Sequence, residues 1–240
     1  MPTFFLDDRE VPFTNGQTIL DAALSAGHYI PHLCWRSELE PHSSCRLCTI
    51  RINGRPFASC TQPAMAGQKV ECDTPDLRAR RLAVTQMLFV EGNHYCPSCE
   101  KSGHCKLQAT GYLLGMQDSH FPHQFPVRGR DMTHPEVVLD RDRCIRCEIC
   151  VRASRALDGK SVFGMHGRGK DTELVVNSPS GLLKDSALSG DDAAVRFCPT
   201  GALGLKAAAF TVPIGERPYD REPISEVELR EYRTREVRHG

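Results

Sequence analysis

Twelve cysteines, eleven of them gathered into three groups, constrain the fold of this 240-residue chain more than any other feature of its sequence. The groups have the patterns C-x10-C-x2-C-x11-C, C-x2-C-x5-C, and C-x2-C-x2-C with a Cys-Pro pair after 47 further residues. Their members are Cys34, Cys45, Cys48 and Cys60; Cys96, Cys99 and Cys105; and Cys144, Cys147, Cys150 and Cys198. Only Cys72 lies outside these groups, so we expect the chain to fold around whatever the other thiols bind.

The N-terminal residues, the apolar stretches and the charge balance limit the kinds of cysteine-rich protein to which this chain can belong. Residues 1–10 lack the basic and apolar regions of an export signal. The longest nearly apolar stretch, residues 82–90, is far too short to span a membrane. We therefore expect a cytoplasmic protein without membrane insertion, whose thiols stay reduced and serve as metal ligands. Lys plus Arg equals Asp plus Glu at 30 each, which argues against a nucleic-acid partner.

The third group has the spacing of a cubane-binding loop. A C-x2-C-x2-C run can wrap three thiolates around one [4Fe–4S] cluster, and a distant Cys before Pro supplies the fourth, as in bacterial-type ferredoxins. In a two-cluster ferredoxin a further Cys would follow after three residues, but here that position is Ser154. This region is expected to hold one cluster.

Zinc is the alternative metal that these cysteines could bind. Zinc ribbons use two matched C-x2-C pairs roughly 15–20 residues apart. Neither the first nor the third group has that arrangement, because each contains a single pair or a continuous triple. The spacing therefore favours iron–sulfur clusters over a zinc-stabilised scaffold.

Local patterns predict an α+β chain. Short strands are expected at 3–6, 9–13, 47–53, 56–60, 68–72 and 137–139. Helices are expected at 19–27, 77–91 and about 105–114, the first capped by Thr18. Residues 118–135 are predicted to be a linker, and the highly charged tail from Val212 is predicted to be an extended arm. Cys72 is expected to be a small residue of the first core, and His28, His32 and His42 are expected to lie at the surface.

The order of the motifs resembles a known electron-transfer module. The stretches that carry the resemblance are Pro31–Cys34, Cys45–Cys48, Ala58–Cys60, Gly92–Gln108, Arg143–Cys150 and Cys198–Leu203. The module is the N-terminal part of the large iron–sulfur subunit of respiratory NADH dehydrogenase. Related forms occur in iron-only hydrogenases and in the diaphorase part of soluble NAD-linked nickel–iron hydrogenases. A chain that stops at this length is most similar to the small diaphorase subunit of the last group.

This resemblance implies a cofactor for each group and a domain for each cofactor. Residues 1–78 would form a β-grasp, plant-ferredoxin-like domain in which Cys34, Cys45, Cys48 and Cys60 bind a [2Fe–2S] cluster. Residues 79–120 would be a helical segment whose [4Fe–4S] cluster has three cysteine ligands and one histidine. Residues 121–211 would form a ferredoxin-like domain with a second [4Fe–4S] cluster on Cys144, Cys147, Cys150 and Cys198. Residues 212–240 would be a charged C-terminal arm.

The histidine ligand is where the sequence departs from the family. The family usually has three residues between this histidine and the first cysteine, but only Tyr95 separates His94 from Cys96. We expect His94 to be the ligand beside Cys96, Cys99 and Cys105, with His104 as the rival. A neutral imidazole in place of a thiolate would raise the potential of the cluster.

The function implied by the resemblance is electron relay without a substrate site in this chain. No dinucleotide fingerprint, flavin motif or nickel-binding cysteine pair is visible in the sequence. The partners implied are a flavin/NAD-binding diaphorase subunit and the small and large subunits of a nickel–iron hydrogenase, together catalysing H2 + NAD+ = NADH + H+. The [2Fe–2S] and last [4Fe–4S] clusters would lie toward the flavin, and the His-ligated cluster toward the hydrogenase. An NAD-linked formate dehydrogenase or a respiratory complex is the alternative.

Overall fold

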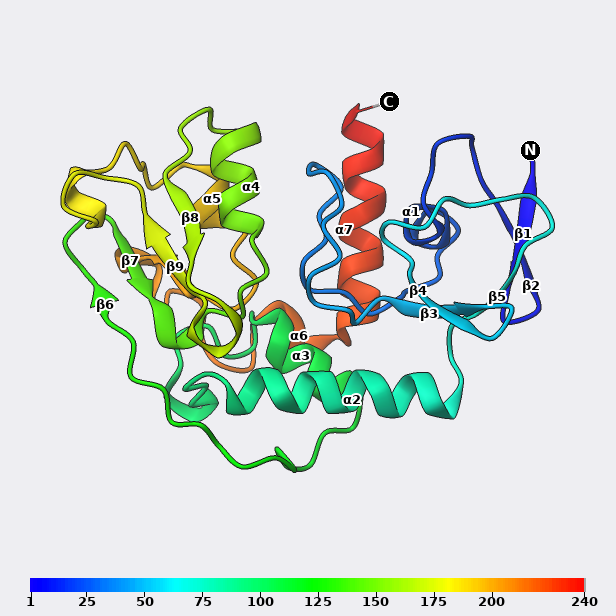
Figure 1. Cartoon of the computed structure of the whole chain (residues 1–240), viewed down its shortest axis with the longest axis horizontal. Helices are drawn as coiled ribbons and strands as arrows, with labels where there is room; N and C mark the ends of the chain where they lie inside the picture. Colours follow the sequence, from blue (N-terminus) through cyan, green and yellow to red (C-terminus); the bar gives the residue numbers. More distant parts are fainter. Residues whose placement is uncertain (240) are drawn as a thin grey trace. The chain divides into compact units, whose positions relative to one another are not determined.

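The structure is a computed structural model that describes residues 1–239, with side chains to Thr234 (Figure 1). The chain packs into two compact units, each described here by itself. Unit 1 comprises residues 1–85, 109–117 and those from 222 onward, and unit 2 comprises residues 86–108 and 118–221. The expected mixture of helices and strands is confirmed.

Unit 1 is organised on a five-stranded sheet with the strand order β2-β1-β5-β3-β4. β1 and β5 run parallel, whereas the other neighbours are antiparallel. Since parallel neighbours need a long crossover, the segment between them carries α1 and the first cysteine loop. The elements are β1 (Thr3–Leu6), β2 (Arg9–Pro12), α1 (Ile19–Ser25), β3 (Thr49–Ile52), β4 (Arg55–Ala58) and β5 (Lys69–Glu71), all at or near the expected positions.

The first helix begins where the sequence places its cap. Thr18 Oγ1 accepts the backbone N–H of Asp21, and the Asp21 carboxylate accepts the backbone N–H of Thr18, which forms a reciprocal capping box. The apolar side of α1 packs on the sheet in one continuous core, whose fully buried members include Phe4, Ile19, Leu20, Leu24 and Ile50. This core lies beneath the loop that carries the first cysteines.

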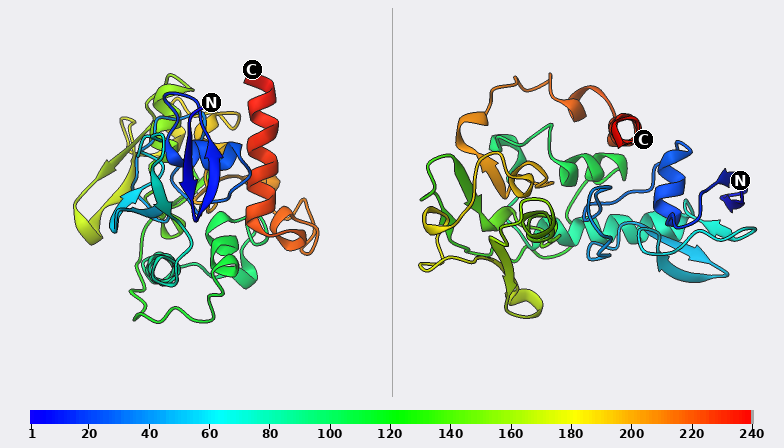
Figure 2. Two further views of the ribbon diagram at one scale, coloured as in Figure 1. Left: turned by 90° about the vertical axis from the view of Figure 1, so that its right-hand side faces the viewer. Right: turned by 90° about the horizontal axis from the view of Figure 1, so that it is seen from above.

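The prediction that the C-terminal tail is an extended arm is wrong for residues 224–239. Residues 224–239 form a helix, α7 (Ile224–His239), instead of an extended arm, and Figure 2 shows it as one continuous helix. Val227 and Tyr232 are buried, Tyr232 belongs to the core of unit 1, and α7 contacts α1. Apolar residues at helical spacing therefore give a charged sequence one buried face.

Unit 2 contains two small sheets and several short helices. β10 (Leu203–Leu205), β7 (Val137–Asp140) and β6 (Arg130–Asp131) form one antiparallel sheet, and β8 (Phe163–His166) pairs with β9 (Glu173–Val176). α4 (Ile149–Ala156) packs on β8 and on α5 (Ala193–Arg196). α6 (Pro218–Arg221) and five 3-10 turns, η1 (Cys96–Ser98), η2 (Arg141–Arg143), η3 (Gly169–Asp171), η4 (Leu183–Asp185) and η5 (Lys206–Ala208), complete the unit.

Two helices contribute residues to both units. α2 (Pro75–Val90) and α3 (Lys106–Leu113) confirm the helices expected at 77–91 and 105–114. The expected linker, 118–135, contains only the two-residue strand β6. No helix among residues 1–239 combines the length and the apolar character needed to cross a bilayer.

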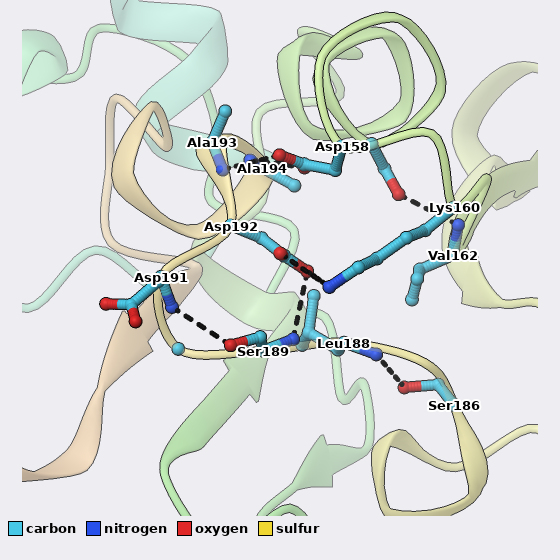
Figure 3. Close-up of polar contacts among 12 residues, drawn as sticks. Asp158, Lys160, Val162, Ser186, Leu188, Ser189, Asp191, Asp192, Ala193 and Ala194 are labelled. Atoms are coloured by element: carbon cyan, nitrogen blue, oxygen red, sulfur yellow. Dashed lines mark hydrogen bonds and ion pairs between the residues drawn. The ribbon is translucent and has the colours of Figure 1, made fainter.

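Polar side chains hold the segment of unit 2 that leads to Cys198 (Figure 3). Lys160 Nζ lies 2.7 Å from Asp192 Oδ1, and the Asp158 carboxylate accepts the N–H groups of Ala193 and Ala194 at 2.8 and 3.1 Å. These N–H groups begin α5 and have no partner within the helix. A carboxylate from the end of α4 therefore caps α5, which fixes the start of the last cysteine segment.

Candidate metal centres

The first cysteine group lies on the loop between α1 and β3 and, for Cys60, just after β4. Two backbone N–H groups point at sulfur: Leu33 N lies 3.4 Å from Cys45 Sγ, and Cys45 N lies 3.5 Å from Cys34 Sγ. Cys48 Sγ and Cys60 Sγ are 3.4 Å apart. Arg46 takes a positive φ of 58°, which turns the short loop between the second and third cysteines.

Hydrogen bonds between these thiols separate their pKa values. The Cys45 thiol lowers the pKa of Cys34 to about 5, and the Cys60 thiol lowers the pKa of Cys48 to about 7. The pKa values of Cys45 and Cys60 are raised because each thiol shares its proton with its neighbour and is buried. One sulfur in each pair is therefore close to the thiolate form that metals bind.

Aromatic side chains pack in the same buried cluster as Cys48 and Cys60 of the first group. Trp35, next to Cys34, lies 5.1 Å from the His32 ring and 6.0 Å from the Tyr232 ring of α7. The prediction that His32 lies at the surface is wrong, because its side chain is buried and Nδ1 is 2.8 Å from the carbonyl of Ile30. Glu228 of α7 lies 4.0 Å from His32 Nε2.

Cys72 is buried in the core of unit 1, as predicted. Burial raises the pKa of its thiol to about 11. The Arg81 guanidinium donates to the carbonyls of Leu47, Thr49 and Cys72 and lies 3.6 Å from Cys72 Sγ. Cys72 therefore belongs to a buried structural contact that joins α2 to β3 and β5.

The middle group surrounds a cavity in unit 2. His94, Cys96, Cys99 and Cys105 line it together with Tyr95, Ser102, Gln108, Arg143 and Thr200. His94 Nε2 is buried and has no hydrogen-bond partner among the described residues, which is costly for a ring nitrogen unless something else binds it. Burial, followed by the positive charge of Arg143, lowers the pKa of His94 to about 4. The imidazole is therefore neutral at pH 7, as a metal ligand must be.

Gly92 makes room for the His94 ring. A Cβ at position 92 would lie 2.6 Å from His94 Nε2 and 2.6 Å from the carbonyl oxygen of Asp142. Asn93 then fixes the segment, because its N–H donates to that carbonyl at 2.9 Å and its amide donates to the Asp142 carboxylate at 3.0 Å. The close approach of these two backbones requires glycine.

His104 occupies a different environment. Its side chain is exposed, its ring lies 6.3 Å from the Tyr219 ring, and it does not line the cavity that His94 and the three cysteines share. Of the two candidates, His94 is the one that the fold brings to the middle group.

The third group lines a second cavity in unit 2. Its walls carry Cys144, Cys147, Cys150 and Cys198 and the apolar side chains of Met165, Leu174 and Leu203. Arg146 N donates to Cys144 Sγ at 3.4 Å, and Leu203 N donates to Cys198 Sγ at 3.3 Å. Burial raises the pKa of Cys144 to about 11, so binding of a metal must release its proton.

Ser154 has a structural role at the position where a two-cluster ferredoxin has its next cysteine. Its side chain is fully buried, and its Oγ accepts the N–H of Val162 at 2.9 Å. The hydroxyl therefore ties α4 to the start of β8 and does not line the cysteine cavity.

Two hydrogen bonds connect the two cavities of unit 2. Lys106 N, one residue after Cys105, donates to the carbonyl of Pro199 at 2.9 Å, one residue after Cys198. Thr200 lines both cavities, and its hydroxyl donates to the Arg143 carbonyl at 2.7 Å. The ligand segments of one site are therefore bonded directly to those of the other.

The donor sets fit iron–sulfur chemistry. None of the twelve cysteines, all of which lie in the described part of the chain, forms a disulfide, and eleven of them belong to the three groups. Among the side chains that the structure describes, those of residues 1–234, no three or more His, Cys, Asp or Glu residues are arranged to hold a single metal ion. Ligands of a cluster lie at the corners of a larger inorganic core and need not meet at one point.

Sequence reasoning missed the arginines that border these sites. Arg143 lines the middle cavity and Arg146 lines the last one. Their positions on either side of Cys144 are visible in the sequence, but the carboxylates that hold them lie in a segment some 40 to 55 residues earlier. Only the folded chain shows that pairing.

Three families match successive parts of the chain. Residues 1–75 match a 2Fe-2S iron-sulfur cluster binding domain, and residues 81–120 match the NADH-ubiquinone oxidoreductase-G iron-sulfur binding region. Residues 134–204 match the ferredoxin-like domain of NADH-quinone oxidoreductase subunit 3. The 2Fe-2S and ferredoxin-like domains expected from the sequence are thereby confirmed.

Relatives match over most of the chain. The gamma subunit of the NAD-reducing hydrogenase HoxS from Cupriavidus necator is 38% identical over 91% of this chain and 93% of its own length. The 75 kDa subunit of NADH-ubiquinone oxidoreductase from Reclinomonas americana is 33% identical over 88% of this chain, but the match spans only 30% of that protein. A crystal structure of an NAD+-reducing [NiFe]-hydrogenase in the H2-reduced state contains a chain with 50% identity and a TM-score of 0.93, covering 96% of this chain and 98% of that one.

Proposed function

Because the chain belongs to the family of gamma subunits of NAD-reducing hydrogenases, we propose that it relays single electrons between a hydrogenase module and an FMN/NAD-binding diaphorase subunit. The reaction of the whole assembly would be H2 + NAD+ = NADH + H+. Iron–sulfur clusters, when bound, accept and donate one electron at a time. The chain's own residues would supply the ligands, the N–H groups that face sulfur, and the burial that sets the potentials.

For the first site we propose a [2Fe–2S] cluster bound by Cys34, Cys45, Cys48 and Cys60. The sheet order, with its single parallel pair and α1 packed on the sheet, fits a β-grasp domain. The support for this ligand set is the pairing of its four sulfurs and the two N–H groups that point at them.

For unit 2 we propose two [4Fe–4S] clusters. Residues Cys96, Cys99, Cys105 and His94 would bind the middle one, supported by the cavity that all four line and by the buried His94 Nε2, which has no partner among the described residues. The other would be bound by Cys144, Cys147, Cys150 and Cys198. The domain limits 1–78, 79–120, 121–211 and 212–240 remain part of this proposal.

The partners proposed are a flavin/NAD-binding diaphorase subunit and the small and large subunits of a nickel–iron hydrogenase. Twelve reduced thiols suit the cytoplasm as the location of that assembly. The single observation that carries the proposal is the relative from Cupriavidus necator, which this chain matches along nearly its whole length.

Purification of the native complex tests this function. We expect H2-dependent reduction of NAD+, and we expect Cys99→Ser to slow it while NADH-to-dye activity at the flavin survives. Because the chain is also 33% identical to the 75 kDa subunit of an NADH-ubiquinone oxidoreductase, NADH-dependent quinone reduction without H2 oxidation would favour a respiratory role instead. A complex with molybdenum and no nickel would indicate a formate dehydrogenase, and zinc without iron would indicate a scaffold.

Variants of the two histidines test the middle ligand set. His94→Cys should keep a [4Fe–4S] cluster but lower its potential, because a thiolate adds negative charge. His94→Ala should make that cluster labile, and His104→Ala should leave it unchanged. An unchanged cluster in His94→Ala together with its loss in His104→Ala would transfer the ligand role to His104.

A further inference from the structure

The loop of residues 143–147 carries one arginine toward each cavity of unit 2. Arg143 and Arg146 stand on either side of Cys144 and Ile145, yet Arg143 lines the cavity of the middle group and Arg146 lines that of the last group. Their side chains are 17% and 18% exposed, so water screens neither charge fully. A guanidinium stays charged at every pH of interest.

Each arginine is fixed by its own carboxylate. Arg143 Nη1 lies 2.6 Å from Glu100 Oε1, and its Nε lies 3.2 Å from Asp140 Oδ2. Arg146 pairs with Glu91 and also donates to the carbonyls of Gly169 and Lys170. Both guanidinium groups are therefore held in place, and each faces a different set of thiols.

We propose that Arg143 and Arg146 are positioning residues that set the potentials of the two [4Fe–4S] clusters separately, Arg143 for the middle cluster and Arg146 for the last one. The physical reason is that a fixed positive charge beside a cluster favours its reduced form, which carries one more electron. The potentials of two clusters whose ligand segments are bonded to each other can in this way be set independently. The inference rests on the ligand sets proposed above.

Redox-poised EPR of the full complex tests the division of roles. In Arg143→Gln the reduced-to-oxidised ratio of the middle cluster at fixed potential should fall at least about tenfold, a shift of about 59 mV. The last cluster should change much less. In Arg146→Gln the larger shift should belong to the last cluster. Equal shifts of both clusters in both variants, or no shift in either, would overturn the inference.

A variant that conserves the charge, and variants of the carboxylates that pair with the arginines, distinguish an effect of charge from a structural disturbance. Arg143→Lys keeps the charge and should keep the wild-type potential; a shift as large as that of Arg143→Gln would contradict the charge argument. Glu100→Gln removes a negative charge and should raise the middle potential, while Glu91→Gln should raise that of the last cluster. These variants keep the test decisive if Arg143→Gln loses iron.

The wild-type EPR spectrum distinguishes failure of the proposed ligand sets from failure of the role proposed for the arginines. Signals lost in Cys99→Ser and Cys150→Ser identify the middle and last clusters. If wild-type complex has no signal that Cys99→Ser removes, the proposed ligand set of the middle site fails. If both signals exist but neither follows its arginine, only the tuning inference fails.

Discussion

The first cysteine site and the two sites of unit 2 are supported by different kinds of structure. Unit 1 has one continuous apolar core under its five-stranded sheet. Unit 2 also buries apolar side chains, such as Val137 and Leu139, but its cysteine segments are held by charged and polar side chains such as Asp158, Arg143 and Arg146. We therefore expect unit 1 to fold mainly on burial of apolar surface, and unit 2 to depend more on the cluster ligation proposed above.

Removal of iron should have the largest effect, and it should be unequal. On anaerobic chelation we expect amide protection in residues 94–105, 144–150 and 198–203 to fall on the order of 100-fold, about 2.7 kcal/mol, because bound metal is folding energy there. Protection of β1, β3 and β5 should change little. Hydrogen exchange with mass spectrometry measures both regions in one sample. Equal loss of protection in the two units would refute the distinction.

Tyr232→Ala should weaken unit 1 alone. The ring lies 6.0 Å from that of Trp35, and its hydroxyl lies 3.2 Å from Ser25 Oγ, so truncation opens a cavity beside the first cysteine loop. The expected loss of unfolding free energy is about 3–5 kcal/mol. Denaturant unfolding followed by the [2Fe–2S] signal measures it.

Thr234→Ala is the matched control for Tyr232→Ala, since Thr234 is exposed on the same helix. Its effect should be within about 0.5 kcal/mol. If Tyr232→Ala were as mild as the control, α7 would not be part of the support of the first site.

Cys72→Ser should have a smaller effect than Tyr232→Ala. A serine hydroxyl can accept from Arg81 as the thiol does, so the loss of unfolding free energy should be about 1 kcal/mol and all three cluster signals should persist. Cys60→Ser, just after β4, should weaken or shift the [2Fe–2S] signal, because oxygen is a harder ligand for iron. Loss of that signal in Cys72→Ser with Cys60→Ser unaffected would reverse the assignment.

The same contrast explains what the sequence could predict. Cysteine spacing identifies the ligand groups, and Thr18 and the apolar spacing that follows it locate α1, because both signals are local. The buried state of His32 and the helix of residues 224–239 depend on the core of unit 1, which the charged tail does not reveal by itself.

The features that the sequence could not predict are contacts between residues far apart along the chain. Arg143 meets Glu100, and Arg146 meets Glu91, only after the two segments fold together. Likewise, Ser154 signals a missing cysteine in the sequence, but its bond to Val162 N is a tertiary detail. Pairs of this kind have no periodic or spacing signal that a single sequence could provide.

Iron and acid-labile sulfide per chain test the central claim most directly. Two, four and four iron atoms give about ten per chain, with matching sulfide, after anaerobic reconstitution. About six irons would remove one cubane from unit 2, and about fourteen would mean an additional cluster. Either result, or stoichiometric zinc in place of iron, would contradict three iron–sulfur sites built from eleven cysteines and His94.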